Sequence, residues 1–160
     1  MVTISAGLVF AASNIFLEKQ IGESCEMKDQ PTTVLVVDDE RIIADALAAL
    51  LGQDGYSASA VYDGDSALER IRTGIPDVVI VDVTMPGMSG IELAITIRDS
   101  WPSCKVLLVS GNTAPEDVLA DMHKRGYEFT LLSKPGLLGE LHRFFTDFHS
   151  EVLPRTLAPV

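Results

Sequence analysis

Four short apolar runs, each followed at once by an acidic, hydroxyl or basic residue, constrain this chain more than any other feature. The runs occupy residues 33–37, 77–81, 105–109 and 129–133, and they lead into Asp38-Asp39, Asp82, Ser110 and Lys134. Their lack of polar alternation is typical of strands covered on both faces, as in a parallel sheet. Function in such a sheet gathers beyond the carboxyl ends of the strands. We therefore expect three carboxylates, one hydroxyl and one ammonium group at that edge.

Strand and helix patterns alternate five times after Pro31. We predict strands at residues 33–37, 56–61, 78–81, 106–109 and 129–132, and helices at 41–53, 64–73, 91–99, 113–125 and 137–148. Asp63 is placed to cap the second helix, Gly74 to end it, and Thr113 to cap the fourth. Gly87 and Gly90 are interpreted as residues that permit loop conformations. This alternation predicts right-handed crossovers and a three-layer α/β/α sandwich.

The length of 160 residues fits one domain with a sizeable core. We assign that domain to residues 31–150, with an N-terminal extension at 1–30 that is flexible or weakly helical and a C-terminal tail at 151–160. The first 17 residues contain no Lys or Arg, unlike the start of a signal peptide, and are short for a membrane span. Met27 is a second possible start of the protein.

Charge and cysteine content narrow the class of protein further. The net charge is −11 and the isoelectric point is about 4.5, which argues against direct nucleic-acid binding. Cys25 and Cys104 are far apart in sequence and lack neighbours at metal-ligand spacing, so we predict two free thiols in a reduced, cytoplasmic setting. Neither a nucleic acid nor a membrane is expected as a direct partner.

Four motifs follow one another along the chain: Val36-Val37-Asp38-Asp39-Glu40, Asp82-Val83-Thr84-Met85-Pro86-Gly87, Ser110-Gly111 and Lys134-Pro135. Together they resemble the motifs of a response regulator receiver domain. The resemblance covers about residues 31–150 and implies a flavodoxin-like, doubly wound, five-stranded parallel sheet of order 2-1-3-4-5. In that order the first and third strands are neighbours, roughly 4.8 Å apart. Asp38, Asp39 and Asp82 would then converge, and a cation would relieve their repulsion.

The same resemblance implies the chemistry of the site. Asp82 would accept a phosphoryl group from the phosphohistidine of a sensor histidine kinase or a histidine phosphotransfer protein, with Mg²⁺ as cofactor. Asp39, Asp82 and the main-chain carbonyl of Thr84 would ligate the metal directly, and Asp38 partly through water. Lys134 would supply positive charge and Ser110 a hydrogen bond to the phosphoryl oxygens. Thr84 and Asn112 would flank that group, and a cis Lys134–Pro135 bond would aim the amine inward.

One position departs from the family pattern. Receiver domains usually carry Tyr or Phe three residues before the lysine, where this chain has Leu131. We therefore keep two functions open. The first is a stand-alone receiver, monomeric or weakly dimeric, that signals to an effector protein and is not an enzyme acting on other substrates. The alternative is a degenerate receiver that acts as a phosphorylation-independent docking module.

Two other classes fit the residues less well. A phosphatase of the haloacid dehalogenase type would need a second Asp two residues after the nucleophile, where this chain has Thr84. A flavodoxin would need hydroxyls and amides after the first strand, but Asp38, Asp39 and Glu40 would repel the flavin phosphate.

Overall fold

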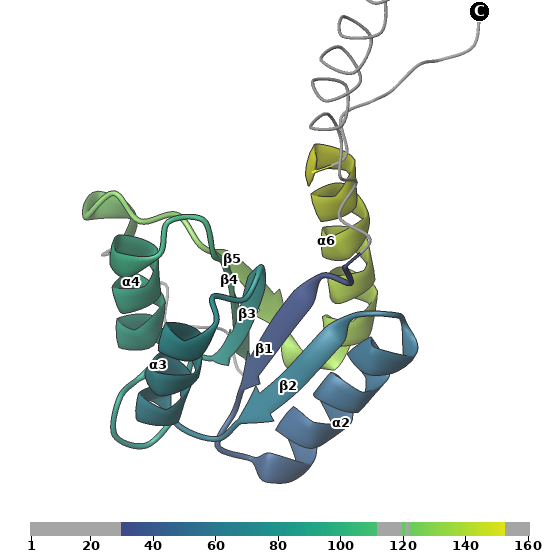
Figure 1. The fold of residues 1–160 in the computed structure, drawn as a ribbon. Helices are drawn as coiled ribbons and strands as arrows, with labels where there is room; N and C mark the ends of the chain where they lie inside the picture. The colour runs from purple at the N-terminus through teal and green to yellow at the C-terminus, as the bar shows by residue number, and fades with distance from the viewer. Residues whose placement is uncertain (1–29, 112–119, 121, 153–160) are drawn as a thin grey trace, which may run out of the picture. The chain divides into compact units, whose positions relative to one another are not determined.

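The computed structural model describes residues 30–111, 120 and 122–152 (Figure 1). The elements in chain order are β1 (Thr33–Val37), α2 (Arg41–Gln53), β2 (Ser57–Val61), α3 (Gly64–Thr73), β3 (Val78–Asp82), α4 (Gly90–Ser100), β4 (Lys105–Ser110), β5 (Thr130–Ser133), the short 3₁₀ helix η1 (Lys134–Gly136) and α6 (Leu137–Val152). The strands form one parallel sheet of order β2-β1-β3-β4-β5, so the predicted fold class is confirmed.

Most predicted elements agree with the structure within one or two residues. The exception is α6, which continues to Val152, past its predicted end at residue 148. Thr113, Asn112 and most of the helix predicted at 113–125 lie outside the described residues, as do residues 1–29 and 153–160. In the described part of the chain, no helix combines the length and apolar character that crossing a bilayer requires.

Helices cover both faces of the sheet, as the apolar strands predict. Leu35 and Val37 of β1 pack on one face with buried side chains of α3 and α4. Val34 and Val36 pack on the other face with buried side chains of α2 and α6. Successive side chains of a strand point to opposite faces, so each strand supplies both halves of the core. The two pairs of helices lie on opposite sides of the strands in Figure 1.

Local signals set the starts of α3 and α4. The Asp63 carboxylate accepts a hydrogen bond from the Ser66 amide at 2.7 Å, which confirms the predicted cap. Ser89 and Glu92 form a reciprocal capping box at the start of α4. The pattern Ser-x-x-Glu is visible in the sequence and explains why α4 begins at Gly90 rather than at residue 91.

Candidate functional site

Three carboxylates meet where β1 and β3 end. The two strands run in register, with Val37 beside Val81, so the residues that follow them in sequence are brought together. One carboxylate oxygen from each of Asp38, Asp39 and Asp82 lies within 4.8 Å of the other two. Asp38 and Asp82 are each 5% exposed, whereas Asp39 is exposed. Hard oxygen donors at this spacing suit a small divalent cation such as Mg²⁺.

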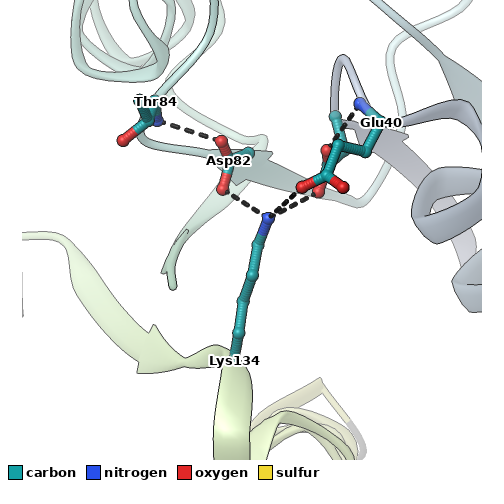
Figure 2. A network of polar contacts seen from close by, with 5 residues as sticks. Glu40, Asp82, Thr84 and Lys134 are labelled. Atoms are coloured by element: carbon teal, nitrogen blue, oxygen red, sulfur yellow. Dashed lines mark hydrogen bonds and ion pairs between the residues drawn. The ribbon is translucent and has the colours of Figure 1, made fainter. Parts of the chain in front are cut away.

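Lys134 reaches this cluster from the edge strand of the sheet, where it directly follows β5. Its Nζ lies 3.0 Å from Oδ1 of Asp82 and 3.1 Å from Oδ2 of Asp38. A third carboxylate, that of Glu40, lies 3.8 Å away through Oε1. Figure 2 shows the lysine side chain extended from the end of β5 toward Asp82 and Glu40. The ammonium group therefore compensates carboxylates from two other strand ends.

Main-chain amides orient the two buried carboxylates. The Thr84 amide donates to Oδ2 of Asp82 at 3.0 Å, and the Glu40 amide donates to Oδ1 of Asp38 at 2.9 Å. Each bond joins a carboxylate to the amide two residues further along, the usual local bond of an Asp side chain at a turn. One oxygen of each carboxylate is thereby fixed, and the other contacts Lys134.

Burial and pairing act in opposite directions on the ionisation of the site. Burial raises the pKa of Asp82 above its usual value, and the contacts with Lys134 and the Thr84 amide offset part of that rise. Burial alone would lower the pKa of Lys134, but its bonds to Asp82 and Asp38 outweigh that effect, so its pKa is raised. The ammonium form of Lys134 is therefore favoured while both carboxylates are ionised.

Ser110 lies on β4 and Leu131 on β5, the two strands that follow β3 in the order of the sheet. Ser110 is the last residue of β4, is 6% exposed and pairs in register with Ser133, the residue before Lys134. Ser110 therefore lies at the same edge of the sheet as Asp82, whose register partner on β4 is Val109. Leu131 is half-buried and packs against the core on the α3 and α4 side of the sheet.

The predicted cis bond between Lys134 and Pro135 is wrong, because the described residues contain no cis peptide bond. The lysine nevertheless points inward. Its main chain continues from β5 into η1, and the Glu140 carboxylate accepts a hydrogen bond from the Ser133 amide at 3.0 Å. This bond from α6 anchors the turn that carries the lysine.

The structure also corrects the interpretation of Gly90. Gly87 has a positive φ of 77°, as a loop glycine can, but Gly90 is the first residue of α4 and its φ is not positive. A Cβ atom at Gly90 would lie 1.9 Å from the main-chain carbonyl oxygen of Asp82. Space rather than loop conformation therefore requires glycine here, because the start of α4 packs directly on the end of β3.

The family profile of the response regulator receiver domain matches residues 34–145, so this chain belongs to that family. Receiver domains are signalling modules rather than classical enzymes, bind Mg²⁺ at an acidic pocket, and interact with histidine kinases and effectors. The cluster of Asp38, Asp39 and Asp82 has the composition of such a pocket.

Curated relatives are longer than this chain. It is 37% identical over 112 residues to the probable transcriptional regulatory protein TcrX of Mycobacterium tuberculosis, covering 70% of this chain and 47% of the relative. It is 31% identical over 150 residues to the hydrogenase transcriptional regulatory protein HoxA of Cupriavidus necator, covering 84% and 30%. The chain therefore spans about half or less of the length of these relatives.

Two solved single-domain-length chains match over nearly their whole length. Chemotaxis protein CheY4 of Vibrio cholerae superposes with a TM-score of 0.62 at 30% identity, covering 71% of this chain and 98% of that one. Response regulator TrrA of Thermotoga maritima, solved in complex with Mg²⁺ and BeF, gives a TM-score of 0.60 at 29% identity, covering 72% and 97%. The similarity to both extends over the five-stranded domain described above.

Proposed function

We propose that this protein accepts a phosphoryl group on Asp82 from a phosphohistidine and signals through the resulting change in its protein contacts. The observation that carries the proposal is the contact of Lys134 Nζ with both Asp38 and Asp82 within a cluster of three carboxylates. A buried carboxylate beside a fixed ammonium group, with further acidic metal ligands, is suited to phosphoryl transfer.

The metal ligands we propose are Asp39, Asp82 and the main-chain carbonyl of Thr84, with Asp38 acting partly through water. The spacing of the three carboxylates within 4.8 Å supports this set. When bound, Mg²⁺ would supply positive charge to the phosphoryl oxygens and reduce the repulsion among the carboxylates. The hydrogen bond from the Thr84 amide to one oxygen of Asp82 fixes the orientation of that side chain.

The side chains then divide the work of transfer. A carboxylate oxygen of Asp82 attacks phosphorus, the bond from phosphorus to the donor imidazole nitrogen breaks, and the imidazole retains the electron pair. Lys134 stabilises negative charge on the phosphoryl oxygens, and Ser110 donates a hydrogen bond to one of them. We propose that Thr84 flanks the group and controls the access of water to the aspartyl phosphate; Asn112, to which the family resemblance assigns the same role, lies outside the described residues.

The partners we propose are a sensor histidine kinase or histidine phosphotransfer protein and a separate effector protein, in the cytoplasm. Of the relatives, TcrX is a probable transcriptional regulatory protein and HoxA is a hydrogenase transcriptional regulatory protein. For this chain we propose a receiver at residues 31–150, with an extension at 1–30 and a tail at 151–160, that acts as a monomer or weak homodimer without contacting nucleic acid or membrane itself.

Labelling with a small phosphodonor tests this function. Wild-type protein incubated with acetyl phosphate and Mg²⁺ should gain one phosphoryl group by intact-mass spectrometry, and chelation of the metal should prevent the gain. Asp82→Asn should abolish labelling. Asp65→Asn is the matched control, because Asp65 is an exposed carboxylate in the first turn of α3. Equal labelling of wild type and Asp82→Asn would refute the assignment.

Leu131 supports a second candidate, the phosphorylation-independent docking module. An aliphatic side chain packed against the core stands where the family usually places an aromatic switch residue. This candidate predicts that an effector binds Asp82→Asn and phosphorylated wild type equally well. The first candidate predicts different affinities, so the same two proteins separate the functions.

A further inference from the structure

Glu40 occupies an unusual position for its residue type. It is the N-cap of α2, yet its side chain makes no capping hydrogen bond. The caps of α3 and α4, Asp63 and Ser89, both accept a bond from their helices. Glutamate is not among the residues that favour this position, because short side chains cap best. The side chain is therefore free of the usual task of a residue at a helix start.

Hydrogen bonds at both its amide and its carbonyl hold the main chain of Glu40 in place. Its amide donates to Oδ1 of Asp38, and its carbonyl accepts from the amides of Ile43 and Ala44 at 2.9 and 3.0 Å. From this fixed position its carboxylate extends to 3.8 Å from Lys134 Nζ (Figure 2). The neighbouring cation, Arg41, lies instead over the ring of Tyr62 at 4.3 Å from its centroid.

Metal binding would affect the three partners of Lys134 differently. Asp38 and Asp82 belong to the cluster whose oxygens lie within 4.8 Å, so a bound cation would replace the charge that Lys134 supplies to them. Glu40 is not a member of that cluster, although it contacts the same ammonium group. Its attraction for Lys134 therefore persists once the cation is present, when the phosphoryl oxygens need the lysine.

We propose that Glu40 is a positioning residue that competes with the phosphoryl group for Lys134 and so weakens phosphoryl binding, although it is not one of the metal ligands. This inference rests on the proposed function and adds a determinant of phosphoryl affinity to it. Glu40 has a side chain 65% exposed, so solvent and salt screen the pair. We expect an effect of roughly two- to fivefold in affinity, the range for an exposed ion pair.

Two successive titrations test the proposal on the full chain, followed by amide chemical shifts in NMR. The first adds Mg²⁺ alone, and the second adds beryllium fluoride, a phosphoryl mimic, at saturating Mg²⁺. Glu40→Gln should bind beryllium fluoride two- to fivefold more tightly than wild type, while its affinity for Mg²⁺ stays equal or falls. High salt should reduce the difference. Glu69→Gln, the same change at an exposed glutamate of α3, should match wild type in both titrations.

The two titrations separate an effect of Glu40 on phosphoryl binding from an effect on metal binding. Equal or weaker binding of beryllium fluoride by Glu40→Gln would overturn the inference, since removal of a competitor must strengthen binding. Failure of wild type itself to bind beryllium fluoride would instead refute the proposed function, and this inference with it. The two failures are therefore distinguishable from the wild-type titration alone.

Discussion

Replacing Gly90 with alanine tests whether the start of α4 and the end of β3 are packed as closely as the structure indicates. The added Cβ would lie 1.9 Å from the Asp82 carbonyl oxygen, 2.8 Å from its carbonyl carbon and 3.0 Å from a Val81 methyl carbon. Relief requires a movement of about 1 Å between α4 and β3. Gly90 and all of β3 are buried, so we expect a loss of about 3 kcal/mol in the free energy of unfolding.

The same movement displaces the main chain of Asp82, so binding at the site should weaken as well. We expect Gly90→Ala to bind beryllium fluoride and Mg²⁺ about tenfold more weakly than wild type, because phosphoryl binding depends on positioning. Urea unfolding and NMR titration measure the two effects. Gly52→Ala is the control, since a Cβ at Gly52 in α2 would have no atom within 4 Å. It should leave stability unchanged or raise it by up to about 1 kcal/mol. A Gly90→Ala variant as stable as wild type would refute the reasoning.

Three further predictions concern Lys134, Glu140 and Cys104. The folded state raises the pKa of Lys134 above its ordinary value of 10.5. The lysine's contribution to stability is therefore complete below pH 10.5 and is lost as the pH rises through the raised value. Urea unfolding at increasing alkaline pH should show a larger loss in the free energy of unfolding for wild type than for Lys134→Met. Glu140→Ala removes the acceptor of the Ser133 amide and should lower the free energy of unfolding by about 1 kcal/mol, with no change expected from Glu69→Ala. Burial raises the pKa of the Cys104 thiol to about 12, so a Cys25→Ser protein should resist a thiol reagent at neutral pH until urea unfolds it; rapid labelling of the native protein would contradict the burial.

The strands and helices could be predicted because their signals are local. Apolar runs end abruptly at Asp38, Asp82 and Ser110, and the helices between them carry apolar stripes with caps such as Asp63. The strand order followed from the family resemblance, and the convergence of the acidic residues followed from that order. The structure confirms the order and brings the three carboxylates together.

The features that sequence reasoning missed depend on distances between elements. Nothing near Gly90 in the sequence indicates that the end of β3 lies against it, since Asp82 and Gly90 approach only after α4 packs on the sheet. The contact of Glu40 with Lys134 likewise joins the start of α2 to the residue that follows β5. The cis bond at Pro135 was expected only from the family resemblance, and the bond is trans. The turn is positioned by the hydrogen bond from the Ser133 amide to the Glu140 carboxylate.

A crystal structure of the full chain with Mg²⁺ and beryllium fluoride tests the central claim most directly. The account predicts one metal ion held by Asp39, Asp82 and the Thr84 carbonyl, beryllium joined to a carboxylate oxygen of Asp82, and Lys134 turned to the fluorides. A metal ion bound away from the three carboxylates, or beryllium fluoride on a residue other than Asp82, would contradict it.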